Sequence, residues 1–124
     1  MEWVEAELSN RIIGCGIKVH RTLGPGFLEK VYEAALAVAL ANAGIDFEQQ
    51  KTVPLLYAQQ PIGGHRLDLF VAGRVVVELK ACKNIEDVHL ATARSYLKAT
   101  GASLALLMNF AKSTLEIRRV VLSL

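Results

Sequence analysis

Residues 67–80, LDLFVAGRVVVELK, constrain the fold more than any other stretch of the chain. β-Branched and aromatic residues flank a glycine, a pattern that predicts two strands joined by a tight turn at 72–74. Side chains alternate between the faces of a strand, so the wholly apolar parity should face a core and the other parity should share the opposite surface. The apolar parity is Leu67, Leu69, Val71, Val75, Val77 and Leu79, and the other is Arg66, Asp68, Phe70, Val76, Glu78 and Lys80.

This parity fixes the register of the expected hairpin. A two-residue turn would put Asp68 and Glu78 on opposite faces. A three-residue loop at 72–74, with Gly73 near the left-handed region, would pair them directly. Paired residues have Cβ atoms ~4.5–5.5 Å apart, so two carboxylates should meet across the hairpin. Like charges at that distance are unfavourable unless a positive group lies between them. A divalent metal would supply that charge, and Lys80, on the same face, would supply part of it.

A simpler interpretation competes with the metal site. Charged residues that alternate with apolar ones commonly form the solvated side of an antiparallel sheet. The spacing D-x9-E-x-K is short, and short motifs recur by accident. From these residues alone, both interpretations stay open.

Composition bounds the class of protein. With 124 residues, 52% of them hydrophobic, the chain is expected to form one globular domain spanning 1–124. The net charge of +2 identifies no partner. Two cysteines give no disulfide framework and indicate a reducing, cytoplasmic environment. The N-terminus lacks a signal-peptide pattern, and the longest apolar run, 34–41, is too short to span a bilayer, so we expect no membrane association.

Hydrophobic periodicity predicts the order helix, helix, three strands, helix, strand, strand. The strand after the first two helices contains Pro54 and should therefore lie at a sheet edge or contain a bulge. The step from the strand at 75–80 through a helix to the next strand should join parallel strands. The expected fold is thus α/β, a mixed β-sheet sandwiched by helices. The expected ranges are helices 2–23, 27–44 and 86–100, strands 47–57, 67–71, 75–80, 103–110 and 115–122, and a turn at 61–64.

Other polar residues have ordinary explanations. If Gly26 is the N-cap of the second helix, Glu29 is its N3 residue and can satisfy the cap N–H. This capping role does not exclude a second role of Glu29 in the site, if the N-terminal end of the helix points toward Asp68 and Glu78. The histidines His20, His65 and His89 have no ligand spacing and are interpreted as structural or surface residues.

Several motifs together resemble one known family. Residues 26–32, GFLEKVY, match the G-x-x-E-x-x-Y signature of the GxxExxY proteins. The preceding LGPG, the D-x9-E-x-K hairpin, SYLKATG at 95–101 and NF at 109–110 follow in that family's order, so the resemblance covers essentially the whole chain. The family is placed in the PD-(D/E)XK nuclease-like superfamily. The resemblance therefore implies a restriction-endonuclease-like α-β-β-β-α-β core, here with an extra N-terminal helix.

The resemblance also implies roles for particular residues. Asp68 and Glu78 would ligate a divalent cation, Lys80 would be the catalytic lysine, and Glu29 would complete the site. Oxygen-only ligands suit Mg²⁺ or Mn²⁺.

Accessory residues by the same resemblance are Thr92, Tyr96 and Tyr32. Relatives often have Gln where this chain has Thr92, four residues before Tyr96. Threonine keeps a hydroxyl but loses reach and an amide.

The leading hypothesis is a Mg²⁺-dependent nuclease that hydrolyses phosphodiester bonds in DNA or RNA. The alternative is a non-catalytic nucleic-acid-binding or assembly module that retains the nuclease fold. The choice between DNA and RNA, and the oligomeric state, a homodimer included, are not determined by the sequence.

Overall fold

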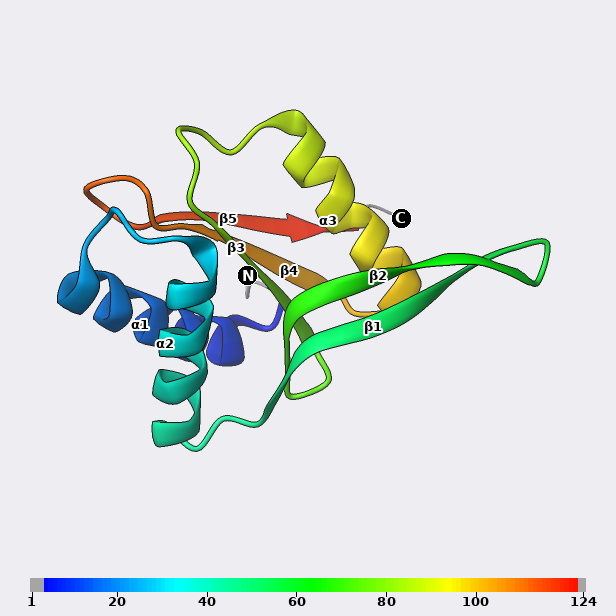
Figure 1. Ribbon diagram of the computed structural model, residues 1–124. Coiled ribbons are helices and arrows are strands. Elements are labelled where there is room, and N and C mark those ends of the chain that lie inside the picture. The colour runs from blue at the N-terminus through cyan, green and yellow to red at the C-terminus, as the bar shows by residue number, and fades with distance from the viewer. Residues whose placement is uncertain (1–3, 123–124) are drawn as a thin grey trace.

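The order of helices and strands matches the order expected from the sequence (Figure 1). The computed structural model describes residues 4–122, so the first two positions of the expected helix 2–23 lie outside the described residues. The elements are α1 (Ala6–Leu23), α2 (Glu29–Asn42), β1 (Phe47–Tyr57), β2 (Gln60–Val71), β3 (Val75–Lys80), α3 (Asp87–Thr100), β4 (Leu104–Asn109) and β5 (Glu116–Val121).

The strands form one mixed sheet in the order β1-β2-β3-β4-β5. Neighbouring strands are antiparallel except β3 and β4, which are parallel and joined through α3. The predicted crossover and the predicted fold class are therefore confirmed. β1 is an edge strand, which explains how it accommodates Pro54, a residue without a backbone N–H to donate.

Two apolar layers cover the two faces of this sheet (Figure 1). α1 and α2 pack on one face, where their buried side chains meet Leu69, Val77 and Leu106. α3 packs on the other face through Ala93 and Leu97, against Val76 and Leu107. β4 is buried along its whole length because it contributes to both layers.

The register of the β2–β3 hairpin is the predicted one. Val71 pairs with Val75 and Leu69 with Val77, which leaves a three-residue connection at 72–74. Gly73 has a φ of 64° and lies in the left-handed region, as expected. Ala72 also has a positive φ, 54°, which the sequence did not indicate. Its backbone N–H donates to the carbonyl of Asp46, and this bond holds the unusual conformation in place.

The expectation that every apolar residue of one parity faces one core is wrong at Leu67. Leu69 and Leu79 pack in the layer under α1 and α2, whereas Leu67 packs in the layer under α3. A local kink is the reason. Gln50, which lies at the level of Asp68 between the paired residues Gln49 and Lys51, has a φ of 51°. The ribbon therefore changes direction at Asp68, and simple alternation stops there.

Two smaller expectations also fail. Residues 61–64 are part of β2, and the turn lies at Ala58 and Gln59, both left-handed with φ of 49° and 65°. The sequence of the second helix is apolar over most of its circumference, a pattern that predicts a helix inside the domain, but Val31 and Val38 of α2 are 41% and 61% exposed. Within residues 4–122, no helix is both long and apolar enough to cross a bilayer.

The left-handed Ala72 gives a prediction about stability. Alanine in this region is strained by its Cβ, so Ala72→Gly should stabilise the fold by about 1 kcal/mol. Equilibrium urea denaturation measures the change. The control is Ala91→Gly on the exposed, helical part of α3, which should instead destabilise by about 1 kcal/mol. Equal losses in both variants would contradict the strain at Ala72.

Candidate active site

The candidate site lies where β2 and β3 part. Backbone pairing of the two strands ends at Leu69 and Val77. Beyond that point, side chains accept the hydrogen bonds of the backbone N–H groups. The backbone N–H of Asp68 donates to Oε1 of Glu78 at 3.1 Å. The backbone N–H of Leu79 donates to Oδ2 of Asp68 at 2.9 Å. The two carboxylates therefore lie close together, but not as the directly paired residues that the sequence predicted, and the parity argument fails at Leu67.

Burial makes this pair electrostatically unusual. Glu78 is only 6% exposed. Burial, reinforced by repulsion from Asp68, raises the pKa of Glu78 to about 9, and the nearby ammonium of Lys80 only weakly opposes the shift. Burial followed by the charges of Glu78 and Asp68 also raises the pKa of Tyr96 to about 12. The Tyr96 hydroxyl thus stays protonated beside the pair and can act as a hydrogen-bond donor.

Hydrogen bonds to the backbone hold the end of β3, where Lys80 lies, against β4. The Lys80 carbonyl accepts from the N–H of Phe110 at 2.9 Å. Two residues on, the Cys82 carbonyl accepts from Nδ2 of Asn109 at 2.8 Å, and the Cys82 N–H donates to Oδ1 of the same amide at 3.1 Å. Asn109 is fully buried, so this two-way contact fastens the segment after Lys80 to β4.

Glu29 is not the N3 capping residue that the sequence predicted. Leu28 is the N-cap of α2, which makes Glu29 the first helical residue, with no side-chain cap bond. Its Oε1 instead accepts from the backbone N–H of Ala81, next to Lys80, at 3.3 Å. The carboxylate therefore lies at the same end of β3 as the Asp68–Glu78 pair.

The tyrosine of the GFLEKVY segment is buried. Tyr32 is fully covered, and its ring stacks on Phe110 with centroids 4.5 Å apart and planes 16° from parallel. Its hydroxyl donates to the Gly24 carbonyl at 2.6 Å and accepts from the Phe27 N–H at 3.2 Å. These contacts fix the loop from which Glu29 projects, so Tyr32 acts on the site through the fold.

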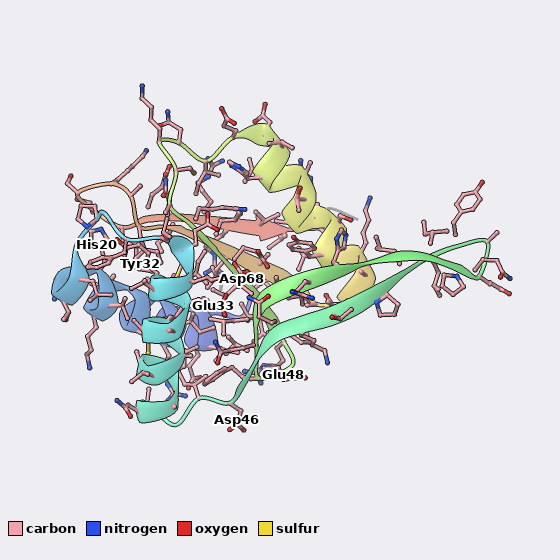
Figure 2. The ribbon with its side chains drawn as sticks, in the orientation of Figure 1. His20, Tyr32, Glu33, Asp46, Glu48 and Asp68 are labelled. Atoms are coloured by element: carbon pink, nitrogen blue, oxygen red, sulfur yellow. The ribbon has the colours of Figure 1, made fainter. Side chains whose placement is uncertain are left out.

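A contact between α2 and β1, at the level of Asp68, was not foreseen from the sequence. Glu33, one turn after Glu29 on α2, accepts from Nε2 of Gln50 at 2.6 Å and from Nε2 of Gln49 at 3.1 Å. These bonds hold the left-handed Gln50 at the level of Asp68 (Figure 2 labels Glu33 and Asp68). Only the two adjacent glutamines could have signalled it, and glutamine has too many roles for that.

The histidines have structural contacts, as expected. Nε2 of His20 lies 2.8 Å from the Lys112 carbonyl, and His89 accepts from the Glu86 N–H in a capping box at the start of α3. Nε2 of His65 lies 2.8 Å from Oγ of Ser95, and its ring meets Tyr96 edge-on with centroids 4.5 Å apart. His65 thereby joins β2 to α3 next to Tyr96.

The donor atoms present fit a hard divalent cation. Among residues 4–122, no three His, Cys, Asp or Glu side chains are grouped to hold a metal ion, so Asp68 and Glu78 form a two-carboxylate set. Mg²⁺ is commonly bound by one or two carboxylates, with waters and substrate phosphate completing its shell. Burial raises the pKa of the Cys82 thiol, which keeps this soft ligand protonated. The repulsion that raises the Glu78 pKa is what a cation between the carboxylates would relieve.

The comparison with known protein families agrees with this geometry. A model of the PD-(D/E)XK nuclease superfamily matches residues 6–120. Since this range spans nearly the whole chain, the protein belongs to that superfamily. Comparisons with curated proteins and with solved structures find no significant match.

The raised pKa of Glu78 predicts how the stability of the metal-free protein depends on pH. Folded Glu78 keeps a proton that the unfolded chain releases, so the free energy of unfolding should fall as pH rises from about 4.5 to about 9. Glu78→Gln cannot ionise, yet it can still accept from the Asp68 N–H, so it should flatten this dependence and raise the melting temperature at alkaline pH. Thermal unfolding with a chelator, across this pH range, measures both effects.

The matched control is Glu48→Gln, because Glu48 is an exposed carboxylate on the edge strand. That variant should follow the wild-type pH dependence. A wild-type slope that persists in Glu78→Gln would contradict the assignment of the buried charge.

Proposed function

We propose that this protein is a divalent-metal-dependent nuclease of the GxxExxY kind, which hydrolyses phosphodiester bonds in nucleic acid with Mg²⁺ or Mn²⁺. The observation that carries the proposal is the meeting of the Asp68 and Glu78 carboxylates at the point where β2 and β3 part, with Lys80 two residues along β3. Membership of the PD-(D/E)XK nuclease superfamily supports the reaction class.

The chain's own residues divide the work. Asp68 and Glu78 would hold the cation, which would polarise a phosphoryl oxygen and supply bound water of lowered pKa. Lys80 would orient the attacking water in line with the scissile bond. Glu29, which bonds the Ala81 N–H, would fix the backbone next to Lys80. Tyr96 remains a protonated donor beside the pair and would contact the phosphate or an ordered water.

Thr92 favours a second candidate function. This half-buried residue stands on α3 four positions before Tyr96, where related proteins often have glutamine. If the missing amide is essential, the protein is a module that binds metal and nucleic acid without cleavage. Restoring the amide with Thr92→Gln tests this point, since the rate should rise or stay the same in an active enzyme.

Substitutions of the ligands and of the lysine separate binding from catalysis. Asp68→Ala should abolish both Mn²⁺ binding, measured by titration calorimetry, and cleavage. Lys80→Ala should abolish cleavage yet keep Mn²⁺ binding. The Mn²⁺ affinity should tighten by no more than about tenfold, because one nearby positive charge is removed. Single- and double-stranded DNA and RNA serve as substrates, each with Mg²⁺ and with Mn²⁺.

The control is Lys83→Ala, which removes an exposed cation three residues after Lys80 and should retain both properties. Equal cleavage by wild type and Lys80→Ala would assign the activity to a contaminant. Metal binding without cleavage of any substrate would favour the binding module. If the wild type binds no cation, the metal-dependent reaction is ruled out.

A further inference from the structure

The β1–β2 hairpin continues well beyond the body of the molecule (Figure 1). Val53, which pairs with His65, is its last buried anchor. We call residues 54–64 the arm. Every residue of the arm is exposed except the partly buried Leu55. Leu56, Tyr57 and Ile62 are 61%, 74% and 64% exposed, a concentration of large apolar side chains that typically marks an interaction surface.

The shape of the arm limits what it can bind. It is a two-stranded antiparallel ribbon closed by the left-handed residues Ala58 and Gln59. Its strands lie ~4.8 Å apart, and a ribbon of this kind fits the major groove of B-form DNA, which is ~12 Å wide. The major groove of A-form RNA is deep and narrow and does not admit it.

The charges around the arm favour a polyanion. Neither 49–67 nor 88–115 contains an Asp or Glu. The first segment carries Arg66, exposed at the base of the arm, and Lys51, which is ion-paired with Glu48 at 3.0 Å. The second carries Arg94 and Lys98, both exposed on α3. The contact of His65 with Ser95 joins these two parts of the molecule. A one-sided set of cations next to a ribbon suits the phosphate backbone.

The tip itself carries no charge. Residues 52–64 contain no Asp, Glu, Lys or Arg, and the tip presents the amides of Gln59 and Gln60 beside Tyr57. Amide side chains hydrogen-bond base edges, and apolar side chains contact thymine methyl groups. Cations at the base and amides at the tip match the usual division between contacts that position a duplex and contacts that read it.

We propose that the arm enters the major groove of B-form duplex DNA, while Arg66, Arg94 and Lys98 hold the flanking phosphates. This proposal rests on the proposed nuclease function and names duplex DNA as its substrate. β2 carries both the arm and Asp68, so the arm contacts bases at a set distance from the site. The eight steps from Gln60 to Asp68 span about 26 Å of strand, which is about eight base pairs of B-DNA.

The decisive variant shortens the arm, replacing residues 55–63 by Asn-Gly so that the Pro54–Gly64 pair closes a two-residue turn. The anchors Val53 and His65 remain. Binding to a duplex of about 30 bp, measured by fluorescence anisotropy without divalent cations, should weaken by about tenfold or more. Binding to an RNA duplex of the same sequence should change by less than about twofold.

Point variants test the same surface without altering the fold. Tyr57→Ala and the double variant Gln59→Ala/Gln60→Ala should each weaken DNA binding. The control Val38→Ala, at an exposed apolar position on α2, should not. Arg94→Gln and Lys98→Gln should each lower the salt dependence of binding by about one ion. Duplexes with fewer than about eight base pairs on the arm side of the cut should bind wild type no better than the shortened variant.

A small phosphodiester, bis(p-nitrophenyl) phosphate, separates this proposal from the nuclease itself. Its hydrolysis needs only the metal site, so the shortened variant should hydrolyse it at the wild-type rate. If wild type hydrolyses no substrate but the arm variants lose DNA affinity, the nuclease proposal fails and the arm proposal stands. Unchanged DNA affinity of the shortened variant overturns the arm proposal, as does an equal loss on duplex RNA. A dimer that becomes monomeric in sedimentation when the arm is shortened would also overturn it, and would identify a second copy of the chain as the partner.

Discussion

The structure depends on how β2 and β3 separate at Asp68 and Glu78. Parting two strands inside a sheet leaves backbone N–H groups without partners, and burying such groups is costly. Here the carboxylate of each residue accepts from the backbone of the opposite strand, at 3.1 and 2.9 Å. The two residues that line the opening therefore also give its backbone N–H groups their hydrogen-bond partners. The remaining cost is electrostatic, and it appears as the raised pKa of Glu78.

The rest of the fold holds three separate segments of the chain close to this opening. The stack of Tyr32 on Phe110 joins the start of α2 to the end of β4. Asn109, the residue before Phe110, clamps the segment after Lys80. The Glu29 carboxylate then spans from α2 to the same segment. The tyrosine of the GFLEKVY segment and the NF pair thus share one structural task, although they lie far apart in the sequence.

The sequence predicted the parts of the fold that follow from local patterns. The order of elements and the three-residue connection at 72–74 come from periodicity and from one glycine. It could not predict the kink at Gln50, because a left-handed glutamine has no local signature and depends on Glu33 in a different element. The failure at Leu67 has the same cause, since alternation assumes a regular strand. Asp68 and Glu78 still come together because the register is fixed on the other side of the kink, by the turn.

The kink also explains how one strand can serve two purposes. On the turn side of Asp68, β2 is buried in the sheet and its register is rigid. On the other side it leaves β3, keeps only β1 as a neighbour and becomes the arm. Pairing with β3 holds β2 on the turn side of this change, and His65 holds it on the other side through Ser95. Glu33 holds the neighbouring strand β1 at Gln50. A strand that is anchored on both sides of its ligand residue can extend far into solvent without loosening that residue, because movement of the arm meets the His65–Ser95 contact before it reaches Asp68.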